Sequence, residues 1–272
     1  MNRYFRFLMF FACGVQLFLA VAFIFQWPIA RAAWPLSYTN QTTYIFIGSI
    51  FAAAAASTVW CLLAKEAGAL AGVALDYLTI FTPLTIFAFQ LASRSSNPKL
   101  PAFVVACAAG ALFGLGLLLW SIRIPIRDPR PMPRLARFSF AFFIIALLIA
   151  GGQLVLKFPS VLPWQVTVDG QVIYGWMFLG AAAYFAYGLL RPSWHNAAGQ
   201  LAGFLAYDVV LIVPFILMLP TIAPRWQLNL IVYTLVVTLS GLLAIYYLFI
   251  NPATRVWRSA RFSPAAIEGA AS

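Results

Sequence analysis

Residues 67–83 read AGALAGVALDYLTIFTP, and residues 198–214 read AGQLAGFLAYDVVLIVP. Each stretch begins with two glycines four residues apart, carries one aspartate beside a tyrosine, and ends in a proline. All other residues in both stretches are uncharged, and with the apolar residues around them each run is long enough to cross the hydrocarbon core of a bilayer as a helix. The two stretches therefore predict two membrane spans that are related copies of each other.

The composition predicts further spans. Of the 272 residues, 64% are hydrophobic and 8% are charged, whereas a soluble domain has about 25% charged residues. This balance excludes a soluble enzyme, a disordered chain and a disulfide-stapled secreted module. Because the apolar runs are apolar on all sides and do not alternate like barrel strands, they predict an all-α integral membrane protein. Eight runs qualify as transmembrane helices: Phe5–Phe25, Thr43–Leu63, Ala69–Leu91, Ala102–Ile122, Phe138–Leu156, Val172–Leu190, Gly199–Leu219 and Leu228–Ile250.

The net charge of +11 predicts an orientation in the membrane. Short cytoplasmic loops carry the excess of Lys and Arg, and here the 17 basic residues divide into 12 and 5. The set of 12 is Arg3, Arg6, Lys65, Arg123, Arg127, Arg130, Arg134, Arg137, Arg191, Arg255, Arg258 and Arg261, and the set of five is Arg31, Arg94, Lys99, Lys157 and Arg225. We therefore expect an inner-membrane protein with both termini cytoplasmic, and no nucleic-acid partner, because the basic residues form no single soluble module.

The first span resembles a signal peptide in its flanks, with Arg3 and Arg6 before it and Ala30-Arg31-Ala32 after it. Its apolar run exceeds the 7–15 residues typical of a signal peptide. We expect an uncleaved span.

A shift of 131 positions aligns the chain partly with itself. Residues 67–72 then align with residues 198–203, with five of six identical, and two prolines of the first half align with prolines of the second half. Two aromatic pairs match at a shift of 130. The matched pairs are Pro28 with Pro159, Pro83 with Pro214, Trp34 with Trp164 and Tyr44 with Tyr174. The shift predicts two four-span repeats, 1–134 and 135–272, the second with a short cytoplasmic tail. Because four is even, the repeats are parallel, related by an axis along the membrane normal.

The glycine pairs Gly68/Gly72 and Gly199/Gly203 each lie about one helical turn apart. Lipid provides no hydrophobic force between helices, so small residues that allow close backbone approach matter more in a membrane. We expect these four glycines to form helix-packing faces.

Two of the six acidic residues, Asp76 and Asp208, lie inside spans, each about 10 Å from a span end. A central Asp costs about 2.5–3.5 kcal/mol on insertion scales, and no Lys or Arg lies inside either span. One interpretation is a proton relay or cation site made by Asp76, Tyr77, Thr79, Tyr207 and Asp208. The alternative is a neutral Asp hydrogen-bonded to a neighbouring helix, with a nearby Tyr as its partner.

Pro83 and Pro214 lie in the middle of their spans. A proline there frees the carbonyl four residues earlier, which belongs to Thr79 or Val210. A freed carbonyl near a carboxyl gives an oxygen-rich lining suited to a cation or a proton-carrying water. A plain helix kink is the alternative interpretation.

The sequence contains little other chemistry. With one histidine and three cysteines at unrelated positions, it predicts no metal site, no cofactor and no catalytic residue, so an enzyme is disfavoured. The Arg-rich, proline-rich segment Arg123–Arg137 suits anionic lipid headgroups. Trp27, Trp34 and Trp164 in the outer loops are expected as aromatic-belt anchors, or as paired lids over an outward cavity.

Three functions remain open. The first is a small transporter or permeation protein with proton- or cation-linked carboxylates. The second is a non-catalytic membrane subunit or scaffold, bound to other subunits or to a second copy of itself. The third is a lipid-modifying enzyme. A water-accessible cavity that reaches either Asp would favour the first, and a sealed core with a large apolar patch would favour the second.

Overall fold

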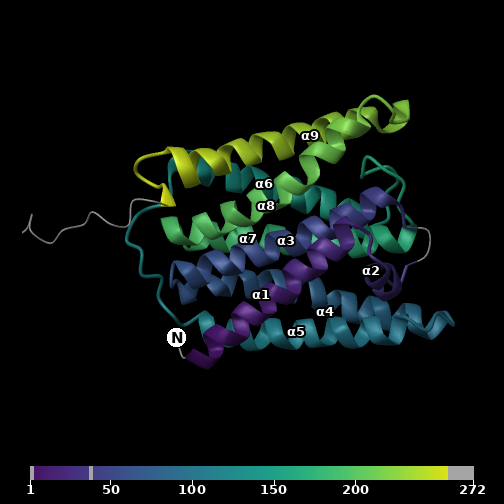
Figure 1. The fold of residues 1–272 in the computed structure, drawn as a ribbon, viewed down its shortest axis with the longest axis horizontal. Helices are drawn as coiled ribbons and strands as arrows, with labels where there is room; N and C mark the ends of the chain where they lie inside the picture. The colour runs from purple at the N-terminus through teal and green to yellow at the C-terminus, as the bar shows by residue number, and fades with distance from the viewer. Residues whose placement is uncertain (1–2, 37–38, 257–272) are drawn as a thin grey trace, which may run out of the picture.

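The computed structural model describes residues 3–36 and 39–256, and its regular structure is helical throughout this part of the chain. Eight long apolar helices could each cross a membrane, as predicted (Figure 1). They are α1 (Arg3–Ile24), α3 (Gln41–Leu63), α4 (Leu70–Arg94), α5 (Leu100–Ser121), α6 (Arg134–Val155), α7 (Val168–Leu190), α8 (Trp194–Met218) and α9 (Pro224–Ile245). Two short elements lie between them, α2 (Pro28–Ala33) and the 3₁₀ turn η1 (Ala67–Ala69), and the π-helical segment η2 (Tyr246–Ile250) continues α9.

Seven of the eight helices begin two to five residues before the predicted spans, several of them at polar or proline residues, and α4 begins one residue after its predicted start. The side chain of Asn40 accepts a hydrogen bond from the backbone N–H of Thr43 at 2.9 Å, and Thr167 accepts one from Gly170 at 3.1 Å. Both caps satisfy backbone donors that a helix leaves unpaired at its start. Pro101 and Pro224 lie in the first turns of α5 and α9, where no backbone donor is needed.

Helix packing divides the bundle into four inner helices, α3, α4, α7 and α8, and four outer helices, α1, α5, α6 and α9. Within each half of the chain, α1 packs on α3 and α4 on α5, and likewise α6 packs on α7 and α8 on α9. Between the halves, α3 packs on α8 and α4 on α7. The outer helices expose apolar side chains such as Leu112 (70% exposed) and Phe138 (74%). Such surfaces suit lipid and not water, which supports a polytopic membrane protein.

The aromatic-belt prediction is wrong for Trp34 and Trp164, which are only 5% and 4% exposed. Trp34 stacks on Tyr174 with ring centroids 6.4 Å apart, and Trp164 donates a hydrogen bond from Nε1 to Thr43 Oγ1 at 3.0 Å. Each tryptophan therefore packs against the other half of the chain. Trp27 is 41% exposed and keeps a surface position.

The start of α1 and the end of η2 lie at the same end of the bundle (Figure 1). This agrees with an even number of crossings. Arg258, Arg261 and the rest of the expected tail lie outside the described residues.

Candidate functional site

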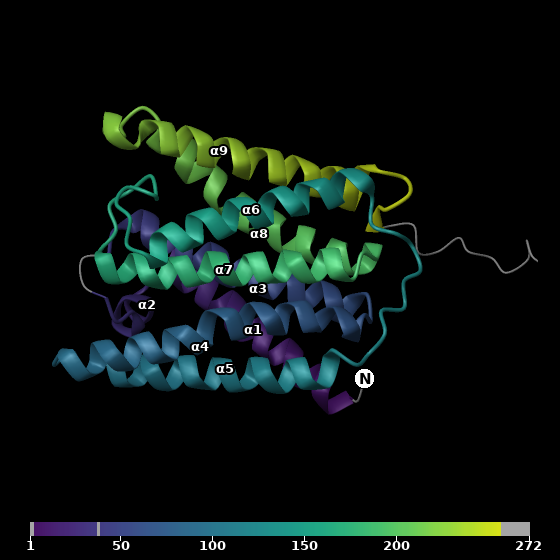
Figure 2. The ribbon, with the colours of Figure 1, turned by 180° about the vertical axis from the view of Figure 1, so that it is seen from behind.

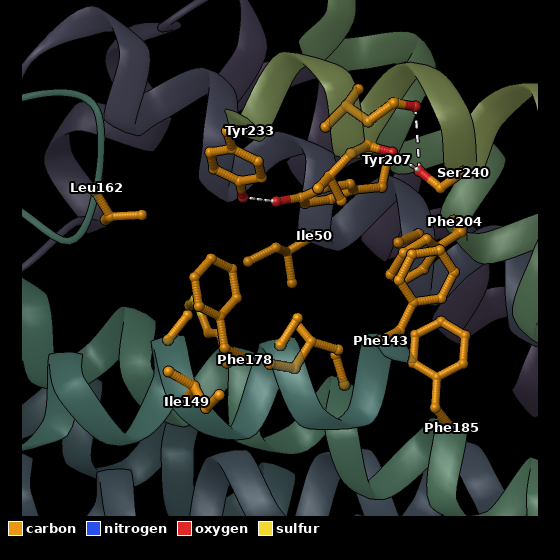
Figure 3. A pocket seen from close by; sticks show the side chains of 18 of the residues that line it. Ile50, Phe143, Ile149, Leu162, Phe178, Phe185, Phe204, Tyr207, Tyr233 and Ser240 are labelled. Atoms are coloured by element: carbon orange, nitrogen blue, oxygen red, sulfur yellow. Dashed lines mark hydrogen bonds between the residues drawn. The ribbon is translucent and has the colours of Figure 1, made fainter. Parts of the chain in front are cut away.

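A cavity of about 610 Å³ lies inside the second half of the bundle (Figure 3). Helices α6, α7, α8 and α9 supply most of its wall, and α3 and α4 supply the rest. Most of the lining is apolar, with the aromatic side chains Phe143, Phe178, Phe185, Phe204, Tyr207 and Tyr233 among it. Both intramembrane acids, Asp76 and Asp208, also line it.

The cavity opens sideways between α6 and α9. These two helices diverge toward the end at which α9 begins (Figure 2). Ile149 on α6 and Leu228 and Val232 on α9 line the cavity and are 58%, 70% and 51% exposed. The rim of this opening is therefore apolar.

Asp76 reaches the cavity from α4, across the contact between α4 and α7. A Cβ added to Gly180 of α7 would lie 2.5 Å from Asp76 Oδ1, so the carboxyl occupies the space that this glycine leaves. The Asp76 side chain is partly exposed, and no described residue gives its carboxyl a hydrogen bond or an ion pair. An unpaired carboxyl in an apolar wall is costly, which makes it a functional candidate.

Asp208 is 3% exposed and is held by α9. Its Oδ2 lies 2.8 Å from Ser240 Oγ, which is also 2.8 Å from the carbonyl oxygen of Val236. A hydroxyl has one hydrogen, so it cannot donate to both oxygens at once. A protonated Asp208 that donates to Ser240, while Ser240 donates to Val236, satisfies both contacts. Asp208 is thus hydrogen-bonded to a neighbouring helix, with a serine as partner where the sequence suggested a tyrosine.

The two tyrosines beside the acids point in different directions. The hydroxyl of Tyr207 lies on the cavity and is hydrogen-bonded to that of Tyr233. Tyr77 faces away from the cavity and accepts a hydrogen bond from Gln16 of α1. Neither Tyr77 nor Thr79 lines the cavity, so the predicted five-residue site is brought together only in its Asp76, Tyr207 and Asp208 members.

Three of the four predicted glycines lie at contacts between the halves. A Cβ on Gly72 would lie 2.7 Å from the Tyr184 ring of α7, and one on Gly203 would lie 3.0 Å from the Ala53 carbonyl of α3. Gly199 meets Trp60 of α3 at 3.3 Å.

Gly68 differs from the other three glycines, because it lies in η1 and meets the backbone of Ile124 in the linker after α5. Pro83 and Pro214 lie inside α4 and α8, and both helices continue past them.

Sequence reasoning missed several residues of the cavity wall, chiefly Gln200, Tyr233 and Ser240, and it missed Gly180, which makes room for Asp76. Gln200 donates from Nε2 to the Tyr184 carbonyl at 2.6 Å, while its buried Oε1 has no partner among the described residues. Its position as the sole polar residue between the glycines of residues 198–203 was an available signal.

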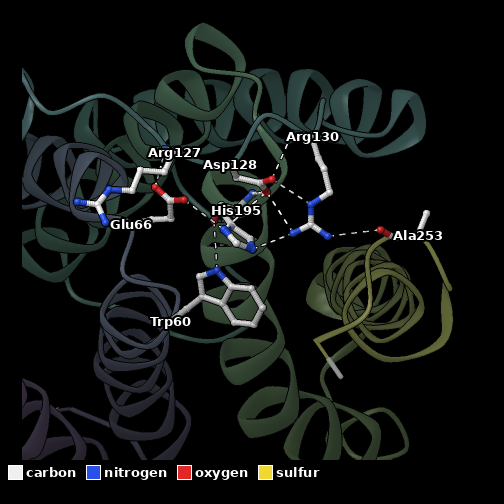
Figure 4. A network of polar contacts seen from close by, with 7 residues as sticks. All are labelled: Trp60, Glu66, Arg127, Asp128, Arg130, His195 and Ala253. Atoms are coloured by element: carbon white, nitrogen blue, oxygen red, sulfur yellow. Dashed lines mark hydrogen bonds and ion pairs between the residues drawn. The ribbon is translucent and has the colours of Figure 1, made fainter. Parts of the chain in front are cut away.

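A second polar cluster, at the end where the chain starts, also escaped prediction (Figure 4). Asp128 accepts a hydrogen bond from the backbone N–H of His195 at 2.9 Å, which caps the start of α8 from the linker. Arg130 lies 2.8 Å from His195 Nε2 and 3.0 Å from Asp128. Because a guanidinium only donates, His195 Nε2 accepts, and His195 Nδ1 donates to Glu66 at 3.2 Å. These contacts fit a His195 ring that carries its hydrogen on Nδ1.

Both carboxyl groups of this cluster have lowered pKa values. Burial of Glu66 opposes its ionisation, but hydrogen bonds from His195 and from the backbone N–H of Arg127 outweigh burial and lower its pKa. Burial of Asp128 is likewise outweighed by hydrogen bonds from Arg130 and by the charge of Arg130, so its pKa is also lowered. Within the described chain, no group of three or more His, Cys, Asp or Glu has an arrangement that could hold a metal ion. We therefore interpret the cluster as a clamp between η1, the linker and α8.

No family model, no curated protein and no solved structure matches this chain. The function therefore has to be argued from the cavity and its residues.

Proposed function

We propose that this chain is a small membrane transporter or permeation protein whose cargo occupies the central cavity, with Asp76 as its proton- or cation-binding group. The observation that supports this most directly is that both intramembrane acids line one cavity. A subunit or scaffold without transport activity needs no such cavity, so the cavity weighs against that alternative. The side opening would also admit a lipid. The hydroxyl–carboxyl pair of the wall, Ser240 with Asp208, has its serine bonded to the Val236 carbonyl of its own helix as well, so we favour transport over lipid modification.

The two acids have different roles in this proposal. Asp208 stays neutral, because its hydrogen bond to Ser240 fits the protonated acid. Asp76 has no partner, so a proton and a cation compete for its carboxyl. The titratable groups that share the cavity with it are Tyr184 of α7, Tyr207 and Asp208 of α8, and Tyr233 of α9, and none of the four carries a positive charge. The competition therefore couples cation binding to proton release.

We also propose that the bundle is built from two parallel repeats, residues 1–134 and 135–272. In this arrangement α1, α3, α4 and α5 correspond in order to α6, α7, α8 and α9. The contact of α3 with α8 then corresponds to the contact of α7 with α4, and both contacts are present. The matched residues Gly72 and Gly203 lie in these two contacts. In this arrangement the cavity lies beside the axis that relates the repeats.

The orientation is part of the same proposal. The end of the bundle that carries the start of α1 and the Glu66–His195 cluster would face the cytoplasm of a plasma membrane, because the sequence assigns 12 of the 17 basic residues to that side. The arginines of 123–137 would meet anionic headgroups there.

A pH jump on vesicles tests the role of Asp76. Vesicles that contain the protein are adsorbed on a solid-supported membrane, and the transient current after the jump is recorded. We expect a current in the wild type that Asp76→Asn abolishes, because the amide binds no proton. Asp208→Asn should reduce the current less, since this acid stays neutral. Asp169→Asn, at the start of α7 and outside the cavity, is the matched control and should leave the current unchanged. An unaltered current in both Asp76→Asn and Asp208→Asn would overturn the proposal.

A further inference from the structure

We infer that the cavity binds a lipophilic organic cation, with an apolar body and one positive charge, which enters from the bilayer between α6 and α9. This inference deepens the proposed function, on which it rests, by giving the chemical class of the cargo. It is carried by the polar groups of the wall, by the wall's aromatic and aliphatic surface, and by the direction in which the cavity opens.

Three acceptors of hydrogen bonds in the wall have no partner among the described residues. They are the carboxyl of Asp76, Oδ1 of Asp208 and Oε1 of Gln200, and the last two residues are only 3% and 1% exposed. Within the described chain, no Lys, Arg or His lines the cavity. A buried acceptor without a donor costs about 1–3 kcal/mol. The wall therefore has unpaired acceptors and no positively charged side chain, and a cationic ligand beside Asp76 would supply the missing charge.

The rest of the wall selects an apolar body. Rings of Phe143, Phe178, Phe185 and Phe204 surround the cavity together with Tyr233 (Figure 3). Aromatic faces attract cations, most strongly where water is excluded. A small inorganic ion would lose its hydration shell against these walls without enough oxygen ligands to replace it. A volume of about 610 Å³ lies within the range of about 300–1,000 Å³ that binds drug-sized molecules.

The route of entry follows from what closes the other sides. At the end where α9 begins, Asn229 donates to the Ser160 carbonyl at 2.5 Å and holds the loop residues 158–162 over the cavity. At the opposite end, Phe140 of α6 packs in one buried cluster with Trp194 and Tyr247. The side between α6 and α9 stays open to lipid. A ligand that arrives by this route must first dissolve in the bilayer, as a lipophilic cation does.

Two ions of the same shape and opposite charge test the inference. Tetraphenylphosphonium and tetraphenylborate are titrated onto the protein in lipid nanodiscs, and binding to empty discs is subtracted. We expect tetraphenylphosphonium to bind at least tenfold more tightly than tetraphenylborate. Asp76→Asn should weaken tetraphenylphosphonium binding at least tenfold, Asp76→Glu should restore most of it, and Asp169→Asn should leave it unchanged. Ala150→Trp, which fills the cavity from α6, should abolish binding of both ions.

Equal affinity for the two ions, no binding of either, or full binding by Asp76→Asn would overturn the inference. The comparison of the two ions needs only the wild type, so it decides the matter even if a variant fails to fold. Failure of the proposed function looks different. Proton currents with no selective binding of tetraphenylphosphonium would reject the cargo class alone. Selective binding at Asp76 without any proton current would reject proton-linked transport and keep the site.

Discussion

The pair α4–α5 and the pair α8–α9 occupy corresponding places in the two halves, yet one is closed and the other borders a cavity. On α5, a Cβ at Gly110 would lie 2.7 Å from the Phe81 ring of α4, and one at Gly114 would lie 3.1 Å from Tyr77 Cβ. On α9, a Cβ at Gly241 would lie 3.5 Å from Asp208, an ordinary contact. The α9 helix lines the cavity with seven residues, and α5 lines it with none. The closer approach of α5 to α4 accompanies a packed first half, and the looser approach of α9 to α8 accompanies the cavity in the second half.

The contacts between the halves should be the most sensitive to substitution, and the α4–α7 contact and the α3–α8 contact should be equally sensitive. We expect Gly72→Leu and Gly203→Leu each to lower the free energy of unfolding by about 3 kcal/mol or more, because each new side chain meets a neighbouring helix. Unfolding by SDS titration in mixed micelles measures this. Gly116→Leu is the control, because nothing lies within 4 Å of its position. A loss in only one of the two glycine variants would mean that the halves are joined by unlike contacts.

The closed and open helix pairs should respond differently to a single methyl group. Gly110→Ala should lower the free energy of unfolding by about 1–3 kcal/mol, because the methyl group would press on the Phe81 ring. Gly241→Ala should be neutral or stabilising by up to about 1 kcal/mol, since alanine favours a helix over glycine and space is available. The same SDS titration measures both. Equal losses in the two variants would remove the structural difference on which the cavity depends.

The hydrogen bond between Asp208 of α8 and Ser240 of α9 should by itself contribute measurably to the free energy of unfolding. Ser240→Ala leaves Asp208 Oδ2 without its partner, and we expect a loss of about 1–2 kcal/mol in the free energy of unfolding. Ser139→Ala on α6 is a matched control, because that hydroxyl bonds only within its own exposed helix surface. No difference between the two variants would show that Ser240 does not hold α9 at the cavity.

The smallest expected effect concerns the clamp at the end of the bundle. Because the folded pKa of Glu66 is lowered, the stability it contributes is fully present above the ordinary value of about 4 and is lost as the pH falls through the folded value. Glu66→Gln should therefore unfold more easily than the wild type at pH 7, by about 1 kcal/mol, and this difference should shrink below pH 4. Thermal unfolding at several pH values measures it. A difference that grows on acidification would contradict the contacts of Glu66.

The sequence predicted the eight spans, because the length and apolarity of each are local properties. It also found Asp76 and Asp208, because a charge inside an apolar run stands out without any structure. It could not separate lipid-facing from protein-facing aromatics, since both environments are apolar, and so it misplaced Trp34 and Trp164. It also missed the bond between Glu66 and His195, which are 129 residues apart and meet only when the halves pack.

The mutual packing of the halves has a consequence for synthesis at the ribosome. Helices α3 and α4 leave the ribosome before α8 and α7, which are their partners. Until the second half is synthesised, the Thr43 hydroxyl has no hydrogen bond from Trp164, and Asp76 has no contact with Gly180 of α7. The first four spans must therefore be inserted with their central faces open and wait there while the second four are translated.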